Sequence, residues 1–234
     1  MKIYKSIAFI LARKNSKRFK SKNTKKLGKL TLTEHSILAV QKSKCFDRII
    51  VSSDDQKILS LNKKYKKVEF LKRPSKLAKD HSKALDVLLF YCKKLDLKKS
   101  YNYIGLFLPT APFKTPRNIR EGFKIIKRTN VDNVISMCKM STPIQFALKE
   151  QNSLMKPFFK NSPLIKNNTR SQNQINTFRP NGSFWICKIK SLIKNKSLYK
   201  GKIAKYEMNN FQSIDIDTKF DFEIAKIIFK KKNK

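Results

Sequence analysis

The chain has 234 residues, of which 40% are hydrophobic, so it is long enough to form one α/β domain with a sizeable core. It carries 54 Lys and Arg residues against 16 Asp and Glu residues, which gives a formal net charge of +38. The lysines are spread over the whole sequence, and no zinc-finger, basic-zipper or RNP-type motif accompanies them. We therefore interpret the charge as a lysine-rich surface and expect no specific nucleic-acid partner.

The cysteines and the apolar runs bound the class of protein further. Cys45, Cys92, Cys138 and Cys187 lie far apart and form no CxxC pair, which argues against a zinc site or a disulfide scaffold. The run "IAFILA" is too short to cross a membrane, and charges follow it rather than precede it as in a signal peptide. We expect a cytoplasmic protein that does not bind a membrane.

Strand and helix patterns alternate along the chain. Apolar runs bounded by polar turns predict buried strands at 6–12, 48–52, 103–108, 133–138 and 183–189. Helical patterns predict a helix over 33–44 capped by Thr33, a second through Leu85, Leu88, Leu89 and Cys92, a third after Thr115-Pro116, and a last one through Phe220, Ile224, Ile227 and Ile228. This order indicates an α/β fold with a mostly parallel sheet, helices on both faces, and ligands bound beyond the carboxyl ends of the strands.

The segment 146–177 interrupts this pattern. It is rich in Asn, Lys and Gln, which is compatible with disorder, but it also contains apolar clusters at Leu154, Met155, Phe158, Phe159, Leu164 and Ile165. We interpret it as a packed arm of a single domain that extends over residues 1–234. Because the arm is too polar to form its own core, its apolar side chains need a partner surface.

The first predicted strand leads into "LARKNSKRFKSKN", a loop with six positive charges. It contains neither GxxxxGK[ST] nor GxGxxG, so a phosphate site here would depend on side chains rather than on bare backbone amides. Arg13 offers a bidentate grip on phosphate oxygens and Lys22 a point charge, with polar contacts from Asn15, Ser16 and Asn23. The alternative is a solvated basic turn.

A second feature is "SIDIDT" at 213–218. In an extended segment Asp215 and Asp217 point to one side, roughly 6.6 Å apart along the chain, while Ile214 and Ile216 point to the other. Because two neighbouring carboxylates repel each other, a divalent cation is a reason to place them together. The alternative is a solvated strand edge before the last helix.

Six segments in order carry a family resemblance: "LARKNSKRFKSKN", "FDRIIVSSDD", "RPSKLAKD", "FLPTAPFKT", "FRPNGSFWI" and "SIDIDT". Over essentially the whole chain the sequence resembles the acylneuraminate cytidylyltransferases, the CMP-sialic acid synthetases. The resemblance implies a Rossmann-like nucleotidyltransferase fold. It also implies that CTP and a sialic-acid-like nonulosonate, a nine-carbon 2-keto acid sugar, are converted to CMP-sugar and pyrophosphate.

The resemblance also implies roles for individual residues. Arg13 and Lys22 would hold the CTP phosphates, Asn23 and Arg73 the nucleotide, and Asp215 and Asp217 would bind Mg²⁺, with Asp217 as a candidate base besides metal hydroxide or solvent. The sugar would contact Arg179, Asn181 and Trp185. In the resembling family an excursion equivalent to the arm packs against a second subunit and helps to close the sugar site, so the resemblance implies a homodimer with a shared sugar site. Two alternatives remain open: activation of the eight-carbon acid Kdo, or a basic nucleic-acid-binding protein that has lost catalysis.

Overall fold

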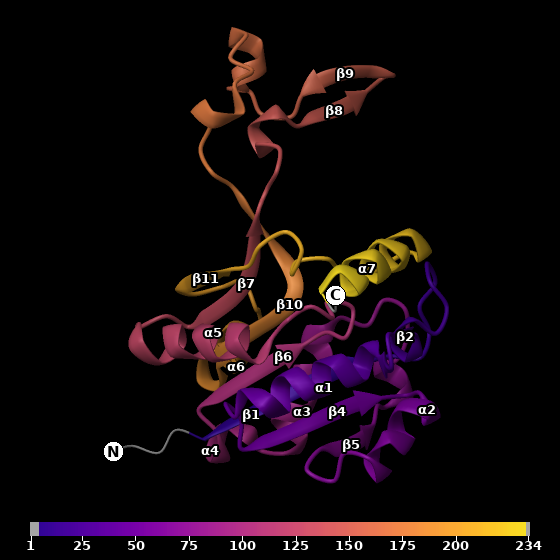
Figure 1. Ribbon diagram of the computed structural model, residues 1–234. Helices are drawn as coiled ribbons and strands as arrows, with labels where there is room; N and C mark the ends of the chain where they lie inside the picture. The colour runs from indigo at the N-terminus through magenta and orange to yellow at the C-terminus, as the bar shows by residue number, and fades with distance from the viewer. Residues whose placement is uncertain (1–4, 233–234) are drawn as a thin grey trace.

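The computed structural model describes residues 5–232, so residues 1–4 and 233–234, the two ends of the predicted domain, lie outside it. The strands are β1 Ser6–Ala12, β2 Lys26–Leu27, β3 Leu30–Thr31, β4 Arg48–Ser53, β5 Glu69–Lys72, β6 Tyr103–Phe107, β7 Asn133–Lys139, β8 Leu148–Gln151, β9 Leu154–Pro157, β10 Phe178–Lys188 and β11 Ile203–Glu207. Within this range the chain folds around a seven-stranded sheet, and two small two-stranded sheets are formed by β2 with β3 and by β8 with β9, the latter in a projection away from the main sheet (Figure 1).

The strand order in the main sheet is β11-β7-β10-β6-β1-β4-β5. β1 pairs in parallel with β4 and β6, β5 continues the parallel set beyond β4, and β11 is parallel to β7. β10 runs antiparallel to both of its neighbours, β6 and β7. The predicted mostly parallel sheet is therefore confirmed, and β10 is its one reversed strand among the described residues.

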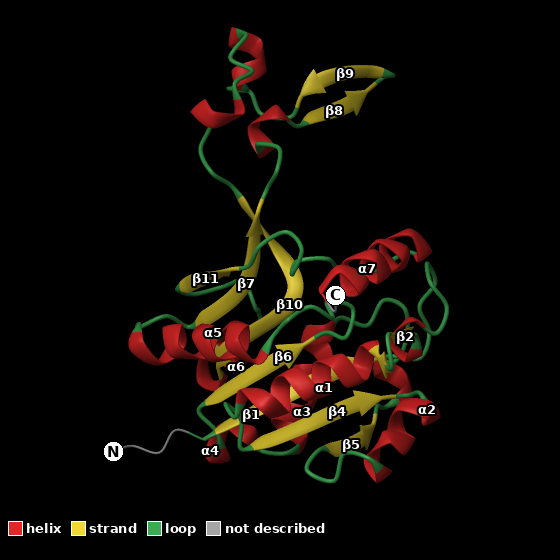
Figure 2. Cartoon of the chain, in the orientation of Figure 1, coloured by secondary structure: helices red, strands yellow, loops and turns green. Residues whose placement is uncertain are grey.

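Helices cover both faces of this sheet, as predicted (Figures 1 and 2). They are α1 Leu32–Ser43, α2 Gln56–Leu59, α3 Ala84–Lys94, α4 Leu97–Ser100, α5 Pro116–Arg128, α6 Ile189–Asn195 and α7 Lys219–Lys232. Side chains of α1, α2 and α5 pack with Ala8 and Ile10 of β1, whereas those of α3, α4 and α6 pack with Ile7 and Phe9. The alternation of β1 thus divides the core into two layers.

One predicted helix cap and one predicted strand start are wrong, and the other predicted strand ends differ from the structure by at most one residue. The cap of α1 is Thr31 rather than Thr33, because Thr31 and Glu34 form a capping box in which each side chain binds the backbone of the other. β10 begins at Phe178, five residues earlier than predicted. It ends at Lys188, because α6 begins at Ile189. The cap of α5 at Thr115 is confirmed.

The arm is a projection between β7 and β10 that stands away from the sheet (Figure 1). It contains the hairpin of β8 and β9 and short 3-10 turns at Pro163–Lys166 and Ser171–Asn173. Most of its large apolar side chains are exposed, among them Leu154, Met155, Phe158 and Ile165. The arm is thus locally ordered, as predicted, but it is not covered by the rest of its own chain.

The described residues also bear on membrane-spanning helices and on the state of the cysteines. In this part of the chain no helix combines the length and the apolar character needed to cross a membrane. All four cysteines are free thiols, and three of them are buried.

Candidate active site

A cavity, here called the main cavity, lies beyond the carboxyl ends of the neighbouring strands β1 and β6. This main cavity has a volume of about 570 Å³ and is bounded by the loop after β1, by the turn after β6, by residues 80–84 and by Asp217. The turn after β6 contributes Leu108, Pro109 and Thr110. A doubly wound sheet places its ligand site at this end of the strands, so the fold and the cavity agree.

The basic loop, residues 13–23, is fixed by contacts near its two ends. Asn23 donates its side-chain amide to the backbone oxygen of Arg13 at 2.8 Å, which closes the loop. Thr33 of α1 donates its hydroxyl to the backbone oxygen of Asn23 at 2.9 Å. Lys22 begins a 3-10 turn and is only 8% exposed, so its ammonium is held at the wall of the cavity.

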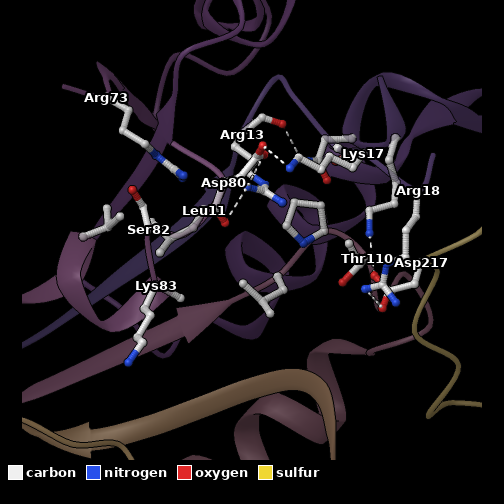
Figure 3. Close-up of a pocket in the computed structure, with 17 residues that line it drawn as sticks. Leu11, Arg13, Lys17, Arg18, Arg73, Asp80, Ser82, Lys83, Thr110 and Asp217 are labelled. Carbon is white, nitrogen blue, oxygen red and sulfur yellow. Dashed lines mark hydrogen bonds and ion pairs between the residues drawn. The ribbon is translucent and has the colours of Figure 1, made fainter. Parts of the chain in front are cut away.

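Four cations of the basic loop are paired with two carboxylates at this cavity (Figure 3). Asp217 forms ion pairs with Arg18 at 2.6 Å and with Lys22 at 2.8 Å. Asp80 forms ion pairs with Arg13 at 3.4 Å and with Lys17 at 3.0 Å. Apart from Lys22, these cations are partly or largely exposed, so an incoming polyanion can replace the carboxylates at little cost.

The segment 213–218 is irregular and belongs to no sheet, although its side chains alternate as predicted. Ile216 is fully buried and donates its backbone N–H to the backbone oxygen of Thr110 at 2.8 Å. Asp221, in the first turn of α7, accepts the backbone N–H groups of Asp217 and Thr218 at 3.0 and 2.8 Å. These bonds fix Asp217 at the cavity wall immediately before α7.

Asp215 lies beside Asp217 but deeper in the protein. Burial, the largest effect, raises the pKa of Asp215, and the Asp217 carboxylate raises it further, while the Thr110 hydroxyl and Lys22 oppose the shift. Its Oδ1 atom is buried without a hydrogen-bond partner. A Cβ on Gly182 would lie 2.9 Å from Oδ2, and Gly182 has a φ of +73°, so only glycine fits at this point of "RPNG".

Two further cavities adjoin the main one. Arg73 lines both the main cavity and a second cavity of about 570 Å³ that contains Asn15. Arg73 donates to the backbone oxygen of Ser52 at 2.9 Å, and its buried Nε has no partner, so donors remain for a ligand. A third cavity of about 310 Å³ is mostly apolar and shares Lys83, Ala84 and Leu108 with the main cavity.

The third cavity accounts for Trp185. Phe184 is fully buried in the core, and its neighbour Trp185 lines this cavity together with Leu198 and Tyr199, so one aromatic of the pair is core and the other faces a pocket, as the alternation predicts. The indole Nε1 of Trp185 is buried without a partner. Such a group is available to an acceptor on a bound molecule.

The structure brings only some of the predicted site residues together. Arg13, Ser16, Lys22, Asn23, Arg73 and Asp217 line the main cavity. Arg179 is exposed at the start of β10, and Asn181 is buried and donates to Ser213 at 2.9 Å, so neither lines a described cavity. A contact of these two residues with a sugar stays a prediction.

Sequence reasoning missed Arg18, Asp80 and Ser82 as cavity residues. Ser82 is the hydroxyl closest after Asp80 in "LAKDHS", and that spacing was the available signal. The pairing of Arg18 with Asp217 had no such signal, because the two residues are 199 positions apart.

The donor set fits a magnesium ion that is completed by a ligand. Mg²⁺ binds through one or two carboxylates together with phosphate oxygens and water. Asp215 has an unpartnered carboxylate oxygen, and Asp217 lies beside it. Across residues 5–232 no group of three or more His, Cys, Asp or Glu side chains is arranged to hold a metal, so a magnesium ion here would depend on these two carboxylates together with ligand and water oxygens.

The chain is similar in sequence to known proteins over nearly its whole length. A profile of the family described as Cytidylyltransferase matches residues 7–232. The chain is 32% identical to the CMP-N,N'-diacetyllegionaminic acid synthase of Legionella pneumophila, over 94% of both chains. It is 28% identical to the N-acylneuraminate cytidylyltransferase of Escherichia coli, over 98% of this chain and 53% of that protein.

Among solved structures, the CMP:2-keto-3-deoxy-manno-octonic acid synthetase complexed with CTP superimposes with a TM-score of 0.71 at 13% identity, covering 97% of this chain and 99% of that one. The 4-diphosphocytidyl-2C-methyl-D-erythritol synthase of Anaerococcus prevotii gives 0.67 at 13% identity and the same coverage. At these identities the likeness concerns the fold, which is the predicted Rossmann-like nucleotidyltransferase fold. Because the family profile spans nearly the whole chain, this protein belongs to the cytidylyltransferase family.

Proposed function

We propose that this enzyme transfers CMP from CTP to the anomeric hydroxyl of a sialic-acid-like nonulosonate and releases pyrophosphate. The observation that carries the proposal is the main cavity, where Arg13, Arg18 and Lys22 face Asp217 beyond the carboxyl ends of β1 and β6. Relatives that cover nearly the whole chain are named as CMP-diacetyllegionaminic acid synthases and an N-acylneuraminate cytidylyltransferase, which supports the substrate class.

In this proposal the triphosphate takes the place of the protein carboxylates. A CTP tetra-anion in the main cavity draws Arg18 and Lys22 away from Asp217, and Arg13 and Lys17 away from Asp80. Asp217 is thereby freed. Mg²⁺ held by Asp215, Asp217 and phosphate oxygens would neutralise charge on the triphosphate.

The chain's residues then align an in-line displacement. The anomeric oxygen attacks the α-phosphorus, the bond to the bridging oxygen of pyrophosphate breaks, and the hydroxyl proton leaves to Asp217 or solvent. Arg13 and Lys22 stabilise charge on the departing pyrophosphate, since preorganised cations act most strongly in a site from which water is excluded. Positioning of the two substrates supplies much of the remaining rate gain.

The apolar third cavity favours an acylated sugar over Kdo. It is lined by Leu106, Leu108, Trp185 and Leu198, and it opens beside the main cavity through the shared residue Leu108. An acylamido methyl group would bury apolar surface here, and its carbonyl would satisfy the unpaired indole N–H of Trp185. Kdo carries no acyl group and therefore has no group to fill this apolar cavity.

The test is a pyrophosphate-release assay with CTP, ATP, GTP and UTP, each combined with N-acetylneuraminate, diacetyllegionaminate, pseudaminate and Kdo. We expect turnover with CTP and at least one nonulosonate, and lower kcat/KM for Kdo. Preference for Kdo would support the alternative substrate class. Absence of pyrophosphate release in all combinations would contradict the proposed reaction.

We further propose that the enzyme is a cytoplasmic homodimer joined through the arm, whose exposed Phe158 and Phe159 stack edge to face at 5.1 Å between ring centroids. Phe158→Asp combined with Phe159→Asp is expected to give monomers in sedimentation velocity, because charge would enter the apolar surface. Sugar affinity should fall while CTP affinity is largely kept.

Ile227→Asp, on an exposed apolar residue of α7, is the matched control and should stay dimeric. A wild-type monomer at micromolar concentration would contradict the dimer, and a fully active monomeric variant would contradict a shared sugar site.

The net charge of +38 predicts only nonspecific binding to nucleic acid. Fluorescence anisotropy with two unrelated DNA duplexes should give equal, weak affinities that fall steeply between low and physiological salt, since phosphates alone would be contacted. Tight binding of one duplex over the other at physiological salt would instead support a nucleic-acid-binding protein.

A further inference from the structure

Lys114 is a buried cation that the proposed reaction does not use. It lies between the turn after β6 and the cap of α5, and the residue is only 4% exposed. Its ammonium donates three hydrogen bonds: to Ser36 Oγ at 2.8 Å, to the backbone oxygen of Leu108 at 2.9 Å, and to the backbone oxygen of Ala111 at 2.6 Å. All three acceptors are neutral, and no carboxylate is bonded to it.

A neutral set of acceptors makes this an expensive place for a charge. Burial lowers the pKa of Lys114 to about 7, while the more distant Asp215 opposes the shift. An apolar side chain would avoid this cost, but it would leave inward-facing oxygens of the turn without donors. The lysine therefore has a task that packing alone does not explain.

The task follows from what the three bonds connect. Leu108 and Ala111 are the two ends of the turn after β6. Leu108 and the two residues between these ends, Pro109 and Thr110, line the main cavity. Ser36 belongs to α1, so the third bond ties this turn to the helix that also holds the end of the basic loop through Thr33. The Lys114 side chain thus connects the turn 108–111 to α1, the helix that holds the end of the basic loop.

The turn also carries the carboxylate segment. The backbone oxygen of Thr110 accepts the N–H of Ile216 at 2.8 Å, and the Thr110 side chain lowers the pKa of the neighbouring Asp215 carboxyl. A shift of the turn therefore moves Asp215 and Asp217 relative to the basic loop. Ser36 also donates its hydroxyl to the backbone oxygen of Leu108, at the longer distance of 3.4 Å, whereas Lys114 bonds to Ser36, Leu108 and Ala111 at 2.6–2.9 Å.

We infer that Lys114 is a positioning residue that fixes the turn 108–111 and, through Thr110, sets the placement of Asp215 and Asp217 against the nucleotide. This inference rests on the proposed function for its kinetic consequence, but its structural consequence holds in the ligand-free protein. Lys114 touches no reacting atom, so its effect should appear in kcat more than in binding of CTP.

The experiment compares Lys114→Met, Lys114→Arg and Ile126→Ala at a temperature where circular dichroism shows each variant folded. Ile126 is a buried residue of the same helix-side core and controls for general loss of stability. Lys114→Met is expected to lower kcat about 100-fold with the KM for CTP little changed, since small misplacements in a reactive geometry cost that much. Lys114→Arg, which keeps the charge and the donors, should recover most of the loss.

A second readout does not depend on activity. In ligand-free Lys114→Met, hydrogen exchange of the Ile216 amide should be about tenfold faster relative to the core amide of Ile10, as the loss of an anchoring hydrogen bond predicts. Ile126→Ala should leave this ratio unchanged. An unchanged ratio in Lys114→Met, or a kcat within about threefold of the unmodified enzyme, would overturn the inference. If the unmodified enzyme were inactive with every sugar, the proposed function would fall, and the exchange ratio would still decide the role of Lys114.

Discussion

Asp217→Asn is expected to lower kcat about 1000-fold while the fold is kept. Asp217 stands at the cavity wall, fixed by the backbone bond to Asp221, and its carboxylate lies beside Asp215. Asparagine preserves the size of the side chain and one oxygen acceptor, but it removes the charge that a divalent cation requires. Asp217→Ala should lose turnover at least as completely, and Asp215→Ala should lose it as well.

The design separates a metal ligand from a structural residue. In EDTA, CTP affinity of Asp217→Asn should be unchanged or higher than in the unmodified protein, because Arg18 and Lys22 no longer have a competing carboxylate. Asp96→Asn is the control, since Asp96 is exposed far from the cavity lining and its positive φ of 44° suits asparagine. Normal magnesium-dependent rates in Asp217→Asn would contradict the metal-site proposal.

Arg13→Ala is expected to weaken CTP binding roughly 10- to 100-fold, as the loss of charged hydrogen bonds predicts. Arg13 lines the main cavity, and its guanidinium makes long contacts with Asp80, at 3.4 Å to the carboxylate and 3.3 Å to the backbone oxygen. Lys20 belongs to the same loop but is exposed and absent from the cavity lining, so Lys20→Ala should change affinity less than about threefold.

Titration calorimetry at physiological ionic strength is the appropriate measurement, because salt screens the exposed lysines and leaves the direct contacts. Equal and small effects of the two substitutions would mean that the basic loop is a solvated turn. A large effect confined to Arg13 would support a phosphate site built from side chains in place of glycine amides.

The sequence predicts the buried part of the fold well and its margins poorly. β1, β4, β6 and β7 are continuous apolar runs because both of their faces are covered, and such runs are visible without a structure. β5 and β11 escaped prediction because they form the two edges of the sheet, where half of their residues are exposed. The spacing of Thr31 and Glu34 marks the cap of α1 in the sequence, whereas the predicted cap, Thr33, lies within the first turn of the helix.

For the site, local chemistry was predictable and long-range pairing was not. Arg13, Lys22 and Asp217 are marked by unusual residue types next to strand ends or helix starts, and the structure places all three at one cavity. The pairing of Arg18 and Lys22 with Asp217, on which the proposed exchange with a triphosphate rests, joins residues almost the whole chain apart. Lys114 was hidden for the opposite reason, since one lysine among 54 basic residues carries no signal until its burial is known.

The most direct test of the central claim follows the oxygen that joins sugar and phosphate. The enzyme is incubated with CTP, Mg²⁺ and a nonulosonate labelled with a heavy oxygen isotope at the anomeric hydroxyl. The masses of the products are then measured by mass spectrometry. The account predicts that the label is found in the CMP-sugar and that pyrophosphate is unlabelled, because the anomeric oxygen attacks the α-phosphorus. Label in phosphate or pyrophosphate, or CMP released together with the unchanged sugar, would contradict it.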